Sequence, residues 1–376
     1  MSASIKPFRV EIPQSALDDL RDRLLNTRWP EAETVDDWSQ GPPLTQIQAY
    51  CDRWAHGYDW RATEARLNSF PHFRTEIDGI DVHFLHVRSP HKDALPLLLT
   101  HGWPSSVLEY LDLIGLLIDP DDESEAFHVV CPSLPGHGFS GKPAEPGWTV
   151  QRTAQAWAEL MARLGYDKYV AQGGDWGSWV SSALGGIDRD RMAGIHLTMP
   201  VARPPEEPVE LDERDQAAMA RMMSFGKNRS GYAAIQGSRP QTLGYALADS
   251  PAGQLAWIID RFWDWAYHDG DLEKAIPADK LLDFATVYWL TNSGASSARM
   301  FWESFDKDPM LPTDVPTGCS VFPTDAWLPR AWARQRFTNL VYWNDLDEGG
   351  HFPALERPEV LAAELRAFRR VLNKGN

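Results

Sequence analysis

Apolar runs that read as buried strands alternate with helical segments along the first half of the chain, and this alternation constrains the fold most strongly. Residues 96–104 and 127–138 are apolar runs that end in loops containing glycine and proline. The runs at 168–175 and 192–200 are separated by a helix-like stretch, and the helix expected at 153–166 is amphipathic. Strands and helices at this spacing form βαβ units. We therefore predict an α/β fold with a mostly parallel central sheet flanked by helices.

The alternation stops near residue 203, and this interruption suggests how the chain is organised. Residues 203–305 begin with the proline-rich acidic stretch RPPEEPVELDE and continue as tryptophan-rich helices, and strand character returns after residue 316. A helical insertion late in a parallel sheet lies over the carboxyl edge of the strands, where such sheets carry their sites. We predict an N-terminal extension at 1–70 that packs on the core and lid. Residues 71–202 and 306–376 form the core, and 203–305 form the lid.

Composition excludes several classes of protein. The 376 residues include 53 acidic and 36 basic side chains, a net charge of −17, which disfavours nucleic acid or an anionic membrane as a partner. No apolar run approaches the ~20 residues of a membrane span, and the first residues lack a signal-peptide core. Cys51, Cys131 and Cys319 cannot all pair and lack metal-ligand spacing. We expect a cytoplasmic protein without a metal or cofactor.

The stretch Gly173-Gly174-Asp175-Trp176-Gly177 has the form of a nucleophile elbow. It reads G-x-D-x-G, where a serine esterase has G-x-S-x-G. Glycines on both sides give the tight strand-turn-helix the room that it needs, and the apex side chain is held out above the sheet. The amide of Trp176 is then free to donate to an oxyanion. The alternative is an ordinary turn in which Asp175 caps the following helix.

An aspartate at the elbow indicates a particular reaction. A serine that attacked saturated carbon would form an ether, which water does not cleave at neutral pH. A carboxylate that attacks saturated carbon forms an ester, which water can cleave to regenerate the enzyme. At an ordinary pKa near ~4, Asp175 is already ionised and needs no base for its attack. The leaving group is then an epoxide oxygen or a halide.

Ester hydrolysis requires a base for water and an acid that orients the base. His351, in the glycine-rich stretch DEGGHF after the last expected strand, fits the base, and an ordinary histidine pKa near ~6.5 suits the task. The alternative is a loop histidine beside a glycine turn. Asp325, which ends the stretch TGCSVFPTD, is the favoured acid, although aspartates also commonly cap helices. Its rivals are Glu206, Asp345, Asp347 and Glu348.

The sequence His101-Gly-Trp-Pro104 follows an early strand. A loop at this place commonly supplies the second amide of an oxyanion hole, here from Trp103, and we place His101 with the same substrate-binding loop. A plain glycine-proline turn is the alternative.

Several sequence blocks occur in the order found in one family. They include FRVEIPQSALDDLRDRLLNTRWP, HGWPSS, PSLPGHGFS, QGGDWGS, SGYAAIQGSRPQTLGYALADSP, VPTGCSVFPTD and GGHFPALERPE. Together they resemble epoxide hydrolases of the α/β-hydrolase superfamily, microsomal-type branch, over almost the full length. The resemblance implies that Asp175 is the nucleophile, His351 the base and Asp325 its acid, with the amides of Trp103 and Trp176 as the oxyanion hole. The membrane anchor of the microsomal enzymes is missing, so we expect a soluble form.

The family also uses two lid tyrosines that donate to the epoxide oxygen. Tyr232, in SGYAAIQ, fits the first. Tyr245 does not fit, and we expect it to pack within the lid. Phe301 stands where the second tyrosine is expected, and a phenyl ring cannot donate. Either one donor suffices, or an indole N–H replaces the tyrosine, or the lid serves another reaction. The candidate indoles are Trp302, Trp289 and Trp176.

Two other functions stay open. One is a haloalkane dehalogenase that uses the same Asp-His-Asp set and holds the halide with indole N–H groups. The other is a non-catalytic small-molecule-binding protein built on the same fold. We expect a small hydrophobic or aromatic epoxide and water as partners, in detoxification or biosynthesis, and the chain is compatible with a homodimer.

Overall fold

A single mixed sheet forms the centre of the molecule. The computed structural model describes residues 4–305, 307–325 and 327–374. Within these residues nine strands follow the order β1-β2-β3-β5-β4-β6-β7-β8-β9. They are β1 (Lys6–Phe8), β2 (His72–Ile77), β3 (Ile80–Val87), β4 (Leu95–Thr100), β5 (Phe127–Pro132), β6 (Tyr169–Gly173), β7 (Met192–Leu197), β8 (Thr317–Val321) and β9 (Leu340–Asp345).

Most neighbouring strands run parallel. From β5 across β4 to β9 every pairing is parallel, whereas β1, β2 and β3 pair antiparallel at one edge. The residues of β5, β6 and β8 are all buried, as in strands covered on both faces. The predicted α/β fold with a mostly parallel sheet is therefore confirmed.

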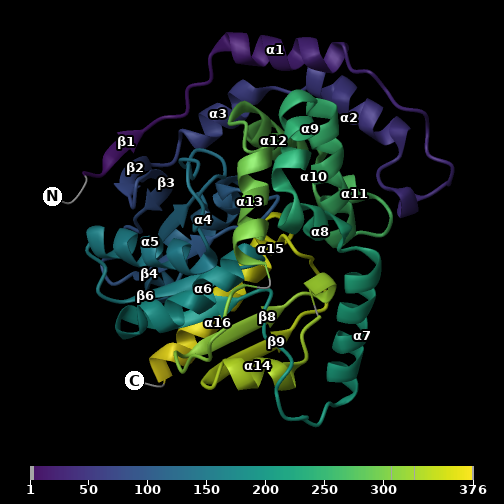
Figure 1. Ribbon diagram of the computed structural model, residues 1–376. Helices are drawn as coiled ribbons and strands as arrows, with labels where there is room; N and C mark the ends of the chain where they lie inside the picture. The colour runs from purple at the N-terminus through teal and green to yellow at the C-terminus, as the bar shows by residue number, and fades with distance from the viewer. Residues whose placement is uncertain (1–3, 306, 326, 375–376) are drawn as a thin grey trace.

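Helices cover both faces of the sheet (Figure 1). Helices α5 (Val150–Arg163) and α6 (Trp176–Ile187) pack together on one face. On the other face α4 (Leu111–Ile118) packs against the C-terminal helix α16 (Pro358–Lys374). This division follows from right-handed crossovers, because the chain moves in opposite directions along the sheet after β4 and after β5. Helix α5 begins at the capping hydroxyl of Thr149 and buries Trp157, Leu160 and Met161.

A group of helices separates β7 from β8. It comprises α7 (Glu213–Asn228), α8 (Gly231–Ser238), α9 (Pro240–Asp249), α10 (Pro251–Trp265), α11 (Leu272–Ala275), α12 (Ala278–Leu290) and α13 (Gly294–Ser304). Helix α13 packs against α8 and α9, while α10 packs against α9 and α12. In Figure 1 the group stands above the sheet end where β6 and β8 finish. The position suits a cover over that edge.

The N-terminal helices are joined to this group of helices by hydrogen bonds and a salt bridge. They are α1 (Gln14–Leu25), α2 (Leu44–His56) and α3 (Trp60–Leu67), and they lie along the outer side of the group in Figure 1. Trp54 donates its indole N–H to the hydroxyl of Thr286 at 2.9 Å. Asp283, on the same helix as Thr286, accepts from the hydroxyl of Tyr58 at 2.6 Å. The salt bridge between Arg53 and Asp279 adds a third link at 2.7 Å.

The turn between β6 and α6 is built by close backbone contacts. A Cβ atom placed on Gly177 would lie 1.8 Å from the carbonyl oxygen of Thr100, at the end of β4. A Cβ on Gly173 would lie 2.1 Å from the carbonyl carbon of Gly177. Asp175, at the apex, adopts φ 49°, which L-residues seldom do. Glycines at 173 and 177 are therefore a steric requirement of the turn.

We expect Gly177→Ala to destabilise the fold strongly and Gly186→Ala to be tolerated. The new methyl group of Gly177→Ala meets backbone that cannot move aside, and we expect a loss of about 3 kcal/mol or more, at the upper end of overpacking costs. Gly186 lies on the same helix with no atom within 4 Å of a built Cβ, so alanine there should stabilise by about 0.5–1 kcal/mol. Urea and thermal unfolding of both variants test this. Equal midpoints for the two variants would contradict the steric account.

Candidate active site

Asp175 lies at the apex of the turn, directly before α6. Asp175 stands at the N-cap position of α6, but its side chain makes no capping hydrogen bond, so the interpretation as a capping aspartate is wrong. The carboxylate is instead directed at the loop after β4, where the amide of Trp103 donates to Oδ1 at 2.8 Å. The amide of Trp176 also hydrogen-bonds to this carboxylate. Gly102 allows the close approach, since a Cβ there would lie 2.3 Å from Oδ1.

His351 meets Asp175 from the loop after β9. Its Nε2 lies 3.7 Å from Oδ2 of Asp175. On the other side of the ring, Nδ1 lies 2.9 Å from both carboxylate oxygens of Asp325. Gly349, at φ 97°, and Gly350 let the loop pass close to α10, and the backbone amide of His351 donates to the carbonyl of Trp265. The histidine predicted from sequence therefore lies between two aspartates.

Asp325 is the acid that the structure brings to His351. It lies in a short 3₁₀ turn (Pro323–Asp325) just after β8, and its side chain is 1% exposed. The four rival acids are all exposed at the surface: Glu206, Asp345, Asp347 and Glu348. Asp345 accepts a hydrogen bond from the indole of Trp343, and Glu348 pairs with Arg357. The arrangement leaves Asp325 to orient the imidazole.

The charges around His351 and Asp175 shift the pKa values of these two side chains. Burial alone would lower the pKa of His351, but the carboxylates of Asp325 and Asp175 outweigh it and raise that pKa to about 9. Burial raises the pKa of Asp175 above its ordinary value, against the opposing effects of His351 and the two amides. The sequence-based expectation of ordinary pKa values for both groups is therefore wrong. The sequence could not reveal how deeply the groups are buried or which charges face them.

An apolar cavity of about 310 Å³ opens in front of Asp175 and His351. Helices α7, α8, α10 and α13 and the loops after β7 and β8 contribute to its wall. The wall residues are Trp176, Trp179, Met199, Pro200, Val201, Ala202, Met222, Phe225, Tyr232, Trp265, Phe301, Phe305, Met310, Asp325, Trp327 and Leu328. An apolar wall around a few polar groups, here Asp175, His351 and Asp325, is typical of a site for a small hydrophobic molecule.

Tyr232 and Phe301 face the same space. The ring of Tyr232 stacks on the indole of Trp103 with centroids 5.4 Å apart, and Phe301 meets Tyr232 edge-on at 5.8 Å. Burial and the charge of Asp175 raise the pKa of Tyr232 well above its ordinary value, so the phenol keeps its proton. Phe301 also contacts the ring of Trp176 edge-on at 4.8 Å. The structure thus places the phenylalanine beside the tyrosine, as the sequence pattern implied.

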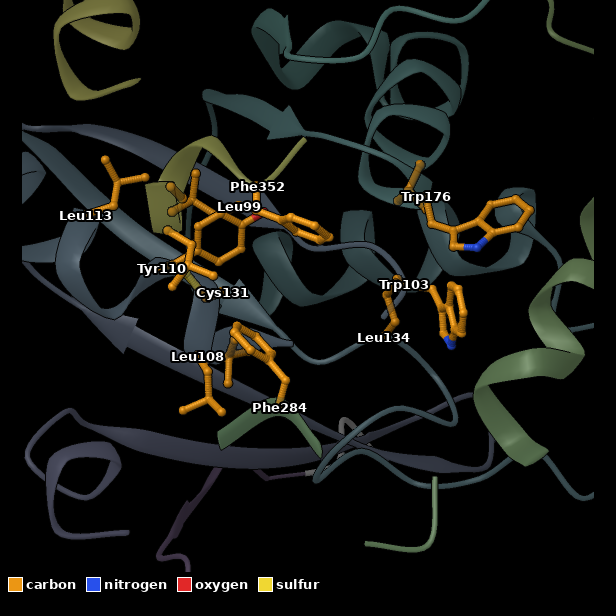
Figure 2. Packing of buried hydrophobic residues seen from close by; sticks show 14 of the residues in the cluster. Leu99, Trp103, Leu108, Tyr110, Leu113, Cys131, Leu134, Trp176, Phe284 and Phe352 are labelled. Carbon is orange, nitrogen blue, oxygen red and sulfur yellow. The ribbon is translucent and has the colours of Figure 1, made fainter. Parts of the chain in front are cut away.

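The indoles of Trp103 and Trp176 lie apart from the core beneath the site. Figure 2 shows the indoles of Trp103 and Trp176 on one side, apart from the cluster around Leu99, Tyr110 and Phe352. These core side chains are almost completely buried. The indole of Trp103 instead contacts the rings of Tyr232, Trp265 and Phe301, and the indole of Trp176 contacts those of Trp179 and Phe301.

His101 does not contribute its side chain to the cavity. Its Nδ1 donates to the carbonyl of Gly102 at 2.9 Å, and its Nε2 accepts from the amide of Leu134 at 3.1 Å. Burial lowers its pKa to about 3, so the ring is neutral and one tautomer satisfies both bonds. The expectation of a substrate-binding side chain is corrected to one that joins two loops.

Tyr245 departs from expectation, and two of the three candidate indoles lie away from the cavity. Tyr245 is 70% exposed on α9 and does not pack within the lid. Trp302 is 41% exposed, and its ring contacts Lys307. Trp289 lies under Arg23 of the N-terminal helix α1. Of the indoles considered from sequence, Trp176 alone lines the cavity.

Two buried residues near Asp175 and His351 were not predicted from the sequence as site residues. Trp265, at the end of α10, lies 4.8 Å from His351 between ring centroids. Glu109, in a 3₁₀ turn (Val107–Tyr110), is 7% exposed and accepts from the hydroxyl of Ser105. An acid among the apolar residues of VLEYL was the one available signal for Glu109. Among several lid tryptophans, nothing in the sequence distinguished Trp265.

Two further observations concern metal binding and membrane insertion. In the described ranges no group of three His, Cys, Asp or Glu side chains is arranged to bind a metal. No helix in the same ranges is long and apolar enough to cross a membrane.

The sheet, the elbow and the Asp-His-Asp group define an α/β-hydrolase with an aspartate at the nucleophile position. Residues 5–110 match the family described as "Epoxide hydrolase N terminus", and residues 96–234 match "alpha/beta hydrolase fold". A putative epoxide hydrolase of Stigmatella aurantiaca is 51% identical over 98% of this chain and 86% of its own length. Epoxide hydrolase 1 of Sus scrofa is 32% identical over 99% of this chain and 90% of its own length. The chain therefore belongs to the epoxide hydrolase family.

Solved structures agree with this assignment. The epoxide hydrolase of Aspergillus niger superposes with a TM-score of 0.88 at 35% identity, covering 98% of this chain and 96% of that one. The juvenile hormone epoxide hydrolase of the silkworm Bombyx mori superposes with a TM-score of 0.92 at 30% identity, covering 99% and 95%. The predicted family resemblance, including its microsomal-type character, is confirmed by these matches and by the mammalian relative.

We expect Asp325→Asn to lower the pKa of His351 from about 9 to near or below the ordinary histidine value. The substitution removes the charge that contributes most to the increase and leaves the burial that opposes it. Imidazole NMR titration of ¹⁵N-histidine-labelled protein measures the shift. Asp345→Asn is the control, since that exposed acid contacts Trp343 and Arg214 and not the imidazole. An unchanged His351 titration in Asp325→Asn would contradict the proposed electrostatic origin.

Proposed function

We propose that this protein hydrolyses epoxides to vicinal diols through a covalent ester on Asp175. The observation that carries the proposal is the position of the Asp175 carboxylate. One oxygen is held by the amide of Trp103, and the other lies 3.7 Å from His351 beside the apolar cavity. Family membership supports the same activity, because the relatives described above are named epoxide hydrolases.

In the first half of the reaction, Oδ2 of Asp175 attacks an epoxide carbon and the carbon–oxygen bond of the ring breaks. Tyr232 donates a hydrogen bond to the epoxide oxygen, and its proton passes to the alkoxide that forms. The raised pKa of Tyr232 favours this role, since the phenol remains protonated until a strongly basic alkoxide appears. The product is a hydroxyalkyl ester of Asp175.

Ester formation then switches His351 from acid to base. With Asp175 ionised, His351 has a pKa of about 9 and carries a proton at neutral pH. The ester has no charge, so one of the two carboxylates that raise this pKa is removed and the pKa falls. The alkoxide takes the proton of Tyr232, and the tyrosinate takes one proton from His351, which restores the phenol and leaves the imidazole neutral. A neutral His351 is thus available only when there is an ester to hydrolyse.

In the second half, His351 takes a proton from water as the water attacks Cγ of Asp175. Oδ1 becomes the oxyanion of the tetrahedral intermediate, and the amides of Trp103 and Trp176 already donate to the carboxylate there. The diol leaves with a proton from the added hydroxyl group. The carboxylate of Asp175 and the protonated His351 are restored together.

The cavity favours an epoxide with an apolar or aromatic substituent. Its wall offers rings and aliphatic groups at Trp179, Phe225, Phe305 and Leu328. A substituent that fills this space loses its contact with water, which stabilises binding by about 25 cal/mol per Å² of apolar surface buried. For location, three buried free cysteines fit the reducing cytoplasm that we propose.

A second candidate reaction is displacement of halide. Trp176 and Trp265 line the cavity wall, and their buried indole N–H groups have no partner in the described part of the chain. Such donors suit a departing halide, which needs no proton. Tyr232 favours the epoxide as substrate, since a protonated phenol beside the nucleophile serves an oxygen leaving group. Halide release from a 1-chloroalkane, measured beside diol formation from styrene oxide, separates the two.

We expect His351→Gln to accumulate a covalent adduct. Alkylation needs no base and continues, whereas ester hydrolysis stalls without one, so the protein gains one substrate mass. Intact-protein and peptide mass spectrometry locate the added mass on Asp175, and Asp175→Ala is the control that forms no adduct. A single wild-type turnover in heavy-oxygen water, with enzyme in excess, should give diol with unlabelled oxygen. Fully labelled diol from that turnover would mean direct attack by water.

Tyr232→Phe should reduce turnover of simple epoxides by about 10²–10³-fold, the typical cost of one preorganised donor. Tyr245→Phe is the matched control, because its phenol is exposed on α9, and it should change the rate little. The companion variant Phe301→Tyr adds a phenol beside Tyr232 and should accelerate alkylation if a donor is lacking. Steady-state rates with styrene oxide test all three. Similar rates for the two tyrosine variants would rule out the role of Tyr232.

A further inference from the structure

A second, much smaller cavity lies behind Asp175. It measures about 10 Å³, which is room for about one water molecule. Its wall is formed by Gly102, Trp103, Ser105, Glu109, Tyr110, Gly174, Asp175, His351 and Phe352. Asp175 and His351 are the two residues that it shares with the apolar cavity. The nucleophile and the base therefore separate a space that fits a substrate from a space that fits water.

Glu109 is a charged side chain in the wall of the small cavity. The reaction described above gives it no role. It is 7% exposed, and Ser105 donates its hydroxyl to Oε2 at 2.5 Å. Among the described residues, Ser105 is the side chain that hydrogen-bonds to this carboxylate, so the second oxygen is available to a molecule in the cavity. A buried carboxylate that borders a water-sized space needs such a partner, because an unsatisfied buried acceptor is costly.

We infer that this small cavity holds the hydrolytic water, and that Glu109 is the positioning residue that orients it toward Asp175. The inference rests on the proposed ester mechanism and names the water site that the mechanism needs. A water there has partners in Glu109, in Nε2 of His351 and in the carboxyl of Asp175, which meets the usual two to four hydrogen bonds of a buried water. Glu109 accepts one hydrogen of the water and His351 removes the other.

The position of the small cavity also suits the direction from which water must attack the ester. The alkyl group enters from the apolar cavity and is bonded to the oxygen of Asp175 nearest His351. Water attacks Cγ above or below the plane of the ester, so the second reactant needs a space that the alkyl group does not fill. A separate cavity supplies that space while the alkyl group still occupies the first.

The charge of Glu109 supports the same step. Glu109 is among the carboxylates whose charge raises the pKa of His351, after Asp325 and Asp175. Burial raises the pKa of Glu109 itself to about 7, against the lowering effect of the Ser105 hydrogen bond and of His351. Once Asp175 is esterified, Glu109 is one of the acids left to stabilise the imidazolium that forms when water gives up its proton, together with Asp325 and the buried Glu356.

Glu109→Gln tests the inference because glutamine keeps the size of the side chain and removes its charge and one acceptor. Rapid-mixing single turnovers with styrene oxide, followed by quenching and mass spectrometry, give alkylation and hydrolysis rates separately. We expect alkylation within about twofold of wild type and hydrolysis slower by about 10–100-fold, so that the ester accumulates. Ser105→Ala, which releases Glu109, should slow hydrolysis in the same direction by a smaller factor.

Glu364→Gln is the control for loss of a buried carboxylate elsewhere. Glu364 is 8% exposed and accepts from Ser320, Tyr342 and Asn344, away from both cavities. It should leave the ratio of the two rates unchanged, with thermal unfolding used to confirm that each variant is folded. Unchanged hydrolysis in Glu109→Gln, or equal slowing of both steps, would overturn the role of Glu109. Absence of any adduct, even in His351→Gln, would instead overturn the ester mechanism itself.

Discussion

The close contact between the start of α6 and the end of β4 is the constraint on which the site depends. Gly177 approaches the carbonyl of Thr100 so closely that a side chain has no room, and this contact fixes the helix directly behind the turn. The turn in turn forces Asp175 into a left-handed backbone conformation and presents its carboxylate to the amide of Trp103. A steric condition on two backbone segments thus sets the direction of the Asp175 carboxylate.

The second organising feature is electrostatic. Asp175, His351 and Asp325 are held together away from water, and the pKa values of Asp175 and His351 depend on the charges that face them. A change of one charge at Asp175 therefore alters the pKa of His351 without any movement of the backbone. Preorganised charges of this kind do not have to be rearranged at each step, which is why rigid packing and catalysis are compatible here.

Local sequence signals predicted the features that depend on neighbouring residues. The elbow, the strand-helix alternation, and the placing of His351 and Asp325 after strands could be inferred because glycines, apolar runs and chain order carry that information. Contacts between distant segments could not be inferred in this way. His101 forms bonds to two loops and Tyr245 is exposed, and neither outcome has a local signature. The pKa of His351 and the place of Glu109 likewise depend on burial, which the sequence does not state.

The contacts between the N-terminal helices and α12 determine which segments of the chain would have to be exchanged together in a chimera with a relative. Trp54, Tyr58 and Arg53 hold the helical group from outside, although more than two hundred residues separate the partners along the chain. A chimera that takes the helices between β7 and β8 from a relative would leave these three side chains facing foreign partners. The natural unit for recombination is therefore discontinuous, and it combines the opening helices of the chain with the segment between β7 and β8.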